Sequence, residues 1–211
     1  MPDPTNIILP ASRVAFQLIC KAGNTSVKWC LIETLCPDTE NHQAYSDEPD
    51  KVFIYAKKEA IPEAYLKVGF VRDPYERLVS CYKNKIVESF NPNFRAKHPG
   101  MFYTGMTFPE FVEAVCEIPD EEADQHFRSF SHDLLPVDKL DIIVRMDYFV
   151  EDWKEVEAEC ARRGLLLKPI GHKNKTEGAF VGDSSLVQKV FHRYEADYNY
   201  LRQVNETKQA A

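Results

Sequence analysis

The sequence contains no apolar run that approaches the roughly 20 residues needed to cross a bilayer as a helix. Its first residues, MPDPTNIILPASR, lack a basic stretch followed by an apolar one, so we expect no signal peptide and no membrane anchor. The six cysteines, at positions 20, 30, 36, 81, 116 and 160, have none of the close spacings that mark metal sites. Scattered free thiols suit a reducing compartment, and we expect a soluble, cytoplasmic protein.

Positive charge is also scarce. The chain has 26 Lys and Arg against 33 Asp and Glu, which gives a net charge of −7. Proteins that bind nucleic acids present a basic face that neutralises the phosphates, so we expect no nucleic-acid partner. A heavily sulfated polysaccharide is a poor substrate for the same reason. The 211 residues are enough for one domain, 1–211, with a substantial core.

Apolar runs alternate with helical patterns along the chain. Strands are predicted at 13–20, 51–56, 65–71 and 140–146. Helices are predicted at 26–36 and onward from Pro74, Thr107, Asp147 and Ser184. This alternation predicts a three-layer α/β/α domain with a mostly parallel central sheet. In such sheets, ligands bind at the carboxyl ends of the strands.

Capping residues define the predicted helix ends. The expected N-caps are Thr25 or Ser26, Asp73 ahead of Pro74, Thr107 in a capping box with Glu110, and Asp147. Gly164 is expected to end the helix that begins at Asp147. The last helix is expected to bury a stripe of Val187, Val190, Phe191, Tyr194, Tyr198 and Leu201. Residues 88–106 are predicted to form an irregular, lid-like excursion.

The stretch ICKAGNTSVKWCL, residues 19–31, places a tight turn between a predicted strand and a predicted helix. This arrangement aims backbone N–H groups and the positive end of the helix at an anion. The candidate phosphate-binding turn consists of Lys21, Ala22, Gly23, Asn24, Thr25 and Ser26. It is not a Walker P-loop, G-x-x-x-x-G-K-[ST], because Lys21 precedes Gly23 and no Gly-Lys pair follows.

A second anion anchor is predicted in FVRDPYERLVSCYKNK, residues 70–85. Arg72 follows a predicted strand and precedes a helix, where its guanidinium suits a phosphate. Ser80, further along the helix, is in reach of a phosphate that lies alongside. An ion pair of Arg72 with Asp73 or Glu76 is the structural alternative. Two separate anchors suggest a ligand with phosphates at two positions.

Together, these two stretches resemble the nucleotide-binding motifs of the sulfotransferases that use 3′-phosphoadenosine 5′-phosphosulfate (PAPS). The second is most similar to the carbohydrate sulfotransferase motif F-V-R-x-P-[FY]-E-R-L-V-S-x-Y-x-N-K. DQHFRSF (124–130), followed by LDIIVRMDYFVED, and GHKNKTEG (171–178) are similar to later segments of that branch. Cys20 stands where the family usually has proline, and Phe127 where it has tryptophan. The Golgi enzymes of the branch carry an N-terminal membrane anchor, whereas none is expected in this sequence. The resemblance therefore implies a soluble, bacterial-type relative.

The resemblance implies the P-loop-NTPase-like sulfotransferase fold and in-line transfer of a sulfuryl group from PAPS to an acceptor hydroxyl. The spent donor is 3′-phosphoadenosine 5′-phosphate (PAP). Lys21 is then expected to stabilise the leaving group while residues 22–26 bind the 5′ end. Arg72 and Ser80 are expected to bind the 3′-phosphate. Asn174 and Lys175, in the segment 171–178, are expected to be additional nucleotide ligands. A sulfate ester carries less charge than a phosphate, so no metal is expected.

A hydroxyl acceptor also needs a general base within about 3 Å of its proton. We expect His126, in the DQHF segment, to be this base. His42 and Glu59 are the alternative candidates. A structural histidine fits the pattern at 126 equally well. The expected acceptor is a carbohydrate or a small molecule. The acidic loop EIPDEEAD, residues 117–124, borders the expected acceptor side and favours a neutral or cationic acceptor.

Two other functions fit part of the pattern. A P-loop-like small-molecule kinase shares the fold, but the sequence lacks the Gly-Lys-[Ser/Thr] order and an evident carboxylate for magnesium. A non-catalytic relative would keep the fold only to bind a nucleotide, and the presence of Lys21, Arg72 and Ser80 argues against it.

Overall fold

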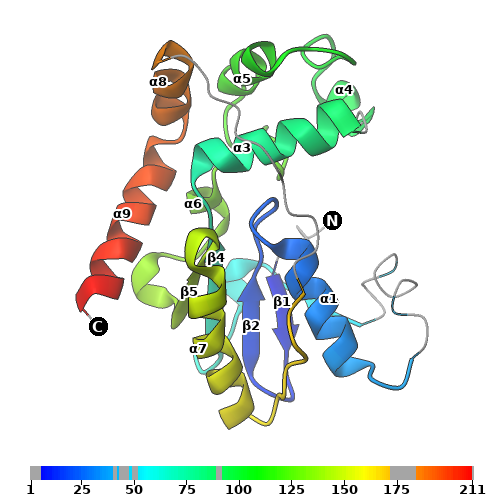
Figure 1. Cartoon of the computed structure of the whole chain (residues 1–211), viewed down its shortest axis with the longest axis vertical. Helices are drawn as coiled ribbons and strands as arrows, with labels where there is room; N and C mark the ends of the chain where they lie inside the picture. The colour runs from blue at the N-terminus through cyan, green and yellow to red at the C-terminus, as the bar shows by residue number, and fades with distance from the viewer. Residues whose placement is uncertain are drawn as a thin grey trace. The chain divides into compact units, whose positions relative to one another are not determined.

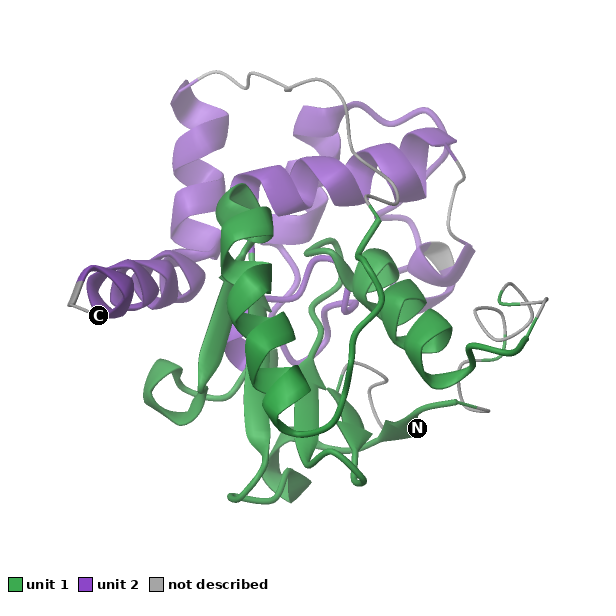
Figure 2. Ribbon diagram, turned by 60° about the horizontal axis from the view of Figure 1, so that its bottom comes forward, with its two compact units in different colours: residues 1–71, 133–175 green, residues 72–132, 176–211 purple. Residues whose placement is uncertain are grey.

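The computed structural model describes residues 6–39, 42, 48, 52–88, 92–171 and 184–210. The chain divides into two compact units, which Figure 2 shows in different colours. Unit 1 comprises residues 1–71 and 133–175, and unit 2 comprises residues 72–132 and 176–211. The single domain expected over 1–211 stays a prediction.

Unit 1 is built on a five-stranded sheet in the order β3-β1-β2-β4-β5. The strands are β1 (Asn6–Leu9), β2 (Val14–Gln17), β3 (Ile54–Tyr55), β4 (Leu66–Val71) and β5 (Ile142–Arg145). β2, β4 and β5 are parallel neighbours, whereas β1 is antiparallel to both β2 and β3. All strands except β1 therefore share one direction, which confirms the mostly parallel sheet. The sequence pattern does not predict β1, because its 4 residues are too few to show a period.

Alternation along the strands decides what each face of this sheet contacts. Phe16 pairs with Val68 in register, so both lie on the same face as Phe70. Phe70 packs against Trp153 of α7 (Phe149–Arg162), with ring centroids 6.3 Å apart. This face is therefore covered by α7, as Figure 1 shows.

The opposite face of the sheet packs against the segment 133–140, which contains the short turn η4 (Val137–Lys139). Gln17 donates a hydrogen bond to Asn6 and accepts one from the backbone N–H of Leu135, each over 3.1 Å. Gly69 is the register partner of Gln17. A Cβ on Gly69 would lie 2.6 Å from Cδ1 of Leu140, so a larger residue there would displace this segment.

Unit 2 is helical. Its elements are α3 (Pro74–Tyr82), the π-helix η3 (Lys83–Glu88), α4 (Pro92–Lys97), α5 (Phe108–Cys116), most of α6 (Phe130–Asp133), α8 (Ser184–Arg193) and α9 (Glu195–Ala210). The predicted apolar stripe of α3 is confirmed, since Leu78, Val79 and Tyr82 are buried. The ring of Tyr82 lies 5.3 Å from that of Phe108 and 5.6 Å from that of Phe111, so α3 and α5 share one core.

Three of the predicted helix ends are confirmed. The Asp73 side chain accepts a hydrogen bond from the backbone N–H of Glu76 over 3.0 Å. Thr107 and Glu110 form the expected capping box at the start of α5. Gly164 follows α7 with a left-handed φ of 76°, a conformation that glycine adopts without strain.

Two predicted N-caps are wrong. α1 (Asn24–Leu35) begins earlier than expected, so Gly23 rather than Thr25 or Ser26 is its N-cap. α7 begins after Tyr148, because Asp147 lies within the short 3₁₀ turn η5 (Met146–Tyr148). In both places the residue type suits a cap, but the backbone enters the helix at another residue.

The predicted last helix is divided at Tyr194 into α8 and α9. Its predicted buried stripe is wrong in part, because Val187 and Phe191 are 45% and 47% exposed while Leu186 is buried. Asp197 is also fully buried. An apolar period cannot predict a buried carboxylate, because such a group enters a core only where other elements supply its hydrogen-bond partners.

The segment 88–106, predicted to be irregular and lid-like, contains α4. Phe94, Phe102 and Met106 from this segment are buried in the hydrophobic core of unit 2. The rings of Phe94 and Phe102 are in contact, with centroids 5.3 Å apart. These side chains therefore belong to the core, and this part of the segment is not an irregular cover.

Candidate nucleotide and catalytic site

The candidate phosphate-binding turn belongs to unit 1 and joins β2 to α1 (Figure 1). Lys21 and Gly23 both have left-handed backbone angles, with φ values of 69° and 75°. A lysine rarely adopts this conformation, which costs a residue with a Cβ about 1–2 kcal/mol. Strain of this kind is concentrated at binding and active sites, where the surroundings impose it. The backbone of Lys21 therefore supports a functional role for this turn.

The turn is also tightly enclosed. The backbone N–H of Ala22 donates to the carbonyl of Ile19 over 3.1 Å. A Cβ on Gly23 would lie 3.1 Å from Sδ of Met146 and 3.5 Å from the ring of Phe149. Successive backbone N–H groups in such a compact turn form a concave surface that suits an anion.

The start of α1 lacks the internal capping seen at α3 and α5. In the described structure, no side chain caps this helix and no acidic residue lies in its first turn. Its first N–H groups and the positive end of its dipole are therefore not neutralised by an acidic cap. Oδ1 of Asn24 is buried and has no hydrogen-bond partner among the described residues. The uncapped helix start fits an anionic group, toward which Nδ2 of Asn24 and the hydroxyls of Thr25 and Ser26 can act as donors, whereas Oδ1 of Asn24 can only accept.

The second predicted anchor lies in unit 2 at the start of α3. Nε of Arg72 is 3.4 Å from Oε2 of Glu76, so the alternative ion pair is present. At this distance, and with the Glu76 side chain 53% exposed, the contact is weak and a phosphate can compete for the guanidinium. Ser80 lies about two turns further along α3 and is buried.

His126, the predicted base, lies in a turn of unit 2. Its Nδ1 is 2.6 Å from Oδ1 of Asp124, which also accepts the His126 backbone N–H over 2.9 Å. Burial raises the pKa of Asp124, but the hydrogen bonds from His126 outweigh it and hold that pKa below its ordinary value. The ionised carboxylate can only accept, so Nδ1 carries the proton and the lone pair of a neutral ring lies on Nε2. In this form, Nε2 can accept a proton as a general base does.

The remaining predicted site residues have separate positions. Nε2 of His42 lies 3.1 Å from the carbonyl oxygen of Cys36 in unit 1. Glu59 is exposed in the short 3₁₀ turn η2 (Lys58–Ala60), also in unit 1. Asn174 and Lys175 lie outside the described residues. Among the described residues, His126 is the candidate paired with a carboxylate that sets its tautomer, and this pairing favours it over His42 and Glu59.

Arg145 is a polar residue that the sequence analysis does not single out. It ends β5, so it lies at the same edge of the sheet as the carboxyl ends of β2 and β4. Its Nε and Nη2 bind Asp152 over 2.9 and 3.0 Å, and its guanidinium lies 4.2 Å from the ring centroid of Tyr148. Arg72 directly follows β4, whereas Arg145 is the last residue of β5, so an arginine at the carboxyl end of a strand is a signal common to both. Held in this way, the Arg145 guanidinium is fixed at this edge of the sheet, with its charge paired to the Asp152 carboxylate.

The acidic loop 117–124 is only partly solvated. Oδ1 of Asp120 accepts a hydrogen bond from Nη2 of Arg193 over 2.7 Å and one from the backbone N–H of Ser129 over 3.0 Å. Glu121 and Glu122 are exposed. The loop therefore combines an internal carboxylate, which holds its structure, with exposed ones that face solvent.

A mostly parallel sheet, with a tight strand-to-helix turn after its middle strand β2, is the architecture of nucleotide-binding α/β proteins. A family model described as "Sulfotransferase family" matches residues 5–203 of this chain. The match covers most of the chain and parts of both units. The chain belongs to the Sulfotransferase family, and the expected P-loop-like fold is that of the family.

Curated relatives carry related names. The chain is 44% identical to "Carbohydrate sulfotransferase 11" of Rattus norvegicus over 36 residues, which are 17% of this chain and 10% of the relative. It is 29% identical to "Carbohydrate sulfotransferase 14" of Mus musculus over 107 residues, with coverage of 46% of this chain and 27% of the relative. The matched segments are thus a small part of the relatives' length. No solved structure matches the chain.

Three further findings concern the described residues. No helix among them is long and apolar enough to span a membrane. No group of three or more of their His, Cys, Asp and Glu side chains is arranged to hold a metal ion. All six cysteines are free, and burial raises the pKa of the Cys30 thiol to about 11.

Proposed function

We propose that this protein transfers a sulfuryl group from PAPS to a hydroxyl of a carbohydrate or small-molecule acceptor. The observation that carries the proposal is the Lys21 turn. A strained lysine lies three residues before the start of a helix that has neither an acidic residue in its first turn nor a side-chain cap. Membership of the Sulfotransferase family supports this interpretation.

In this proposal, residues 22–26 bind the 5′-phosphosulfate through N–H groups and hydroxyls. Arg72 and Ser80 bind the 3′-phosphate, with Asn174 and Lys175 as further ligands. Lys21 neutralises the charge that develops on the oxygen between sulfur and the 5′-phosphate. The preorganised positive charge of such a site acts where negative charge appears in the transition state.

His126 completes the chemistry. The acceptor oxygen forms a bond to sulfur while the bond from sulfur to the 5′-phosphate oxygen breaks, and PAP leaves. The proton of the acceptor hydroxyl passes to Nε2 of His126. Positioning and charge stabilisation are expected to carry most of the catalysis, as in phosphoryl transfer. No metal is required in this proposal, because a sulfate ester carries less charge than a phosphate.

The acceptor proposed here is neutral or cationic. Two relatives are named as carbohydrate sulfotransferases, which supports a carbohydrate hydroxyl. The net charge of −7 and the exposed Glu121 and Glu122 disfavour a polyanionic glycan. We also propose a reducing, cytoplasmic setting, which the free cysteines support.

The first experiment is isothermal titration of PAP and of ADP into the wild type and Arg72→Ala. Charge-assisted hydrogen bonds contribute about 1.5–3 kcal/mol, so Arg72→Ala should weaken PAP binding about tenfold to a hundredfold. ADP binding should not change. Arg162→Ala is the matched control, because Arg162 also pairs with a glutamate of its own helix but is 63% exposed and far along the chain from the motif.

Transfer itself is measured with radiolabelled PAPS and a panel of neutral disaccharides, amino sugars and phenols, with and without EDTA. Label transfer that persists in EDTA supports the proposal. A preference for ADP over PAP, together with phosphate transfer from ATP that needs magnesium, would instead favour the small-molecule kinase. PAP binding without any label transfer would favour the non-catalytic nucleotide-binding relative.

A further inference from the structure

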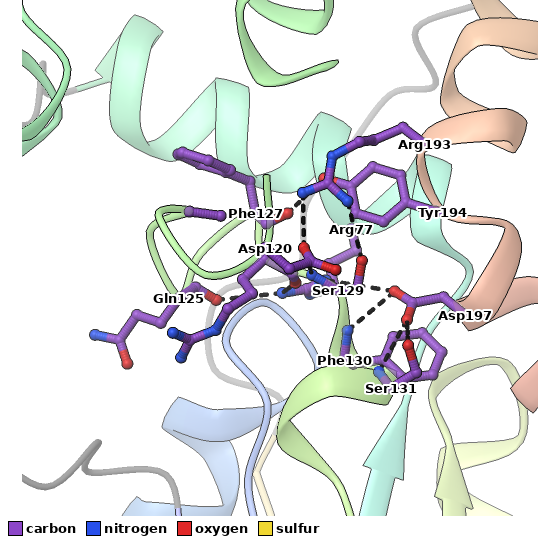
Figure 3. A network of polar contacts seen from close by, with 12 residues as sticks. Arg77, Asp120, Gln125, Phe127, Ser129, Phe130, Ser131, Arg193, Tyr194 and Asp197 are labelled. Carbon is purple, nitrogen blue, oxygen red and sulfur yellow. Dashed lines mark hydrogen bonds and ion pairs between the residues drawn. The ribbon is translucent and has the colours of Figure 1, made fainter. Parts of the chain in front are cut away.

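A buried polar network in unit 2 is left unexplained by the proposed roles (Figure 3). Arg77 lies on α3, between Arg72 and Ser80 in the chain, and is 1% exposed. Asp197 of α9 is 0% exposed, and its Oδ2 lies 4.0 Å from Nη1 of Arg77. A core admits such charges only when hydrogen bonds compensate the loss of water. The other partners of these two residues therefore show what the pair holds in place.

Those partners flank the candidate base. Nη2 of Arg77 donates to the carbonyl of Gln125 over 3.2 Å and to the carbonyl of Arg128 over 2.7 Å. His126 lies between these two carbonyls in the sequence. One guanidinium thus fixes the backbone on both sides of His126 to α3, the helix that carries Ser80.

The C-terminal helices contact the same turn. The hydroxyl of Tyr194 donates to the carbonyl of Phe127 over 2.5 Å. The carboxylate of Asp197 accepts the backbone N–H groups of Phe130 and Ser131 over 3.0 and 2.9 Å. Figure 3 shows these side chains converging on the turn from α3 and from the α8–α9 region.

We propose that Arg77, Tyr194 and Asp197 are positioning residues. They hold the turn of His126 in a fixed position relative to α3, the helix proposed to bind the 3′-phosphate. This inference rests on the proposed function, in which His126 is the base and α3 binds the nucleotide. The break between α8 and α9 at Tyr194 then has a role, because it places Tyr194 and Asp197 against one turn. A rigid connection matters because a misplacement of about 1 Å at a reacting group can cost about a hundredfold in rate.

The test compares Tyr194→Phe with Tyr82→Phe in the full chain. Each substitution removes one buried hydrogen bond from a tyrosine hydroxyl to a backbone carbonyl, since Tyr82 donates to Met106 over 2.9 Å. The chemistry of the change is the same, but of these two hydrogen bonds the one from Tyr194 is made to the His126 turn. Three quantities are measured: the ¹⁵N spectrum of the His126 ring, the affinity for PAP, and turnover with the acceptor found in the panel.

For Tyr194→Phe, we expect the Nε2–H tautomer of His126 to gain population and kcat to fall about tenfold or more, with the Kd for PAP unchanged within twofold. Tyr82→Phe should leave both the tautomer and kcat as in the wild type. Arg77→Lys keeps a positive charge but has a single nitrogen, so it cannot face Asp197 and bind both carbonyls as Nη1 and Nη2 do, and it should shift the tautomer further.

The inference is wrong if Tyr194→Phe keeps the wild-type ring spectrum, or if both Tyr→Phe variants change the spectrum and kcat equally. Equal effects would mean general loss of packing rather than positioning. The proposed function fails separately, if wild-type protein transfers no label to any acceptor. The ring spectra of the variants still decide the positioning inference in that case.

Discussion

The imidazole of His126 and the carboxylate of Asp124 are joined from Nδ1 to Oδ1 over 2.6 Å, and the same oxygen binds the His126 backbone. This contact sets both the tautomer and the ring orientation. Asp124→Asn preserves shape but removes the charge, so it should lower kcat about tenfold to a hundredfold, within the range of general-base catalysis. The affinity for PAP should not change. If Asp124→Asn keeps the wild-type kcat, the pair of Asp124 and His126 has no part in the mechanism. His126→Ala is the reference for complete loss of the base.

Gly23 tests the phosphate-binding turn. Its φ is 75°, and a Cβ added there would lie 3.1 Å from the Met146 sulfur, so there is little room for a side chain. Gly23→Ala should cost at least about 1–2 kcal/mol of unfolding free energy, measured by urea denaturation, and weaken PAP binding. Gly164→Ala is the matched control, because φ is 76° there but nothing lies within 4 Å of an added Cβ. Equal loss of PAP affinity in both variants would contradict a role for the turn.

Acid should weaken the contact between Asp120 and Arg193. Burial raises the pKa of Asp120, but hydrogen bonds from Arg193 and Ser129 outweigh it, so the pKa lies below the ordinary 3.8. Between these two values the unfolded chain binds more protons, and stability falls as pH falls. This contribution is present above pH 3.8 and is lost as the pH drops through the folded-state pKa.

The measurement is the urea midpoint between pH 3 and pH 6 for the wild type and Asp120→Asn. The variant should lose less stability than the wild type as the pH falls, because its amide does not titrate. Parallel curves would show that the Asp120 pair does not contribute to acid sensitivity.

Charge reversal at Glu121 and Glu122 tests the acceptor side. Both side chains are exposed, so Glu121→Lys with Glu122→Lys should leave the fold intact. For a cationic amino-sugar acceptor, KM should rise several-fold through repulsion, while the Kd for PAP stays constant. The control pair, Glu151→Lys and Glu155→Lys, lies on the exposed face of α7. If KM for the acceptor and Kd for PAP change together, the loop does not belong to the acceptor side.

Several features follow from local sequence because neighbouring residues decide them. The capping box of Thr107 with Glu110, the Asp73 cap and the Gly164 helix end depend on side chains within one turn, and the structure confirms each. The mostly parallel sheet follows from alternating strands and helices. The motifs around Lys21 and Arg72 identify the family for the same reason, since each lies within one short stretch.

Other features depend on residues that are distant in the chain. Arg77 and Asp197 are 120 positions apart, and no periodicity in either helix indicates that a charged pair lies in the core. Likewise, Gly23 contacts Met146 only because β5 and α7 fold against the start of α1. The sequence by itself therefore determined the family and the mostly parallel sheet, and it predicts the candidate anion-binding motifs, through local patterns. Only the tertiary structure decided which buried partners hold His126, because packing between distant segments selects those contacts.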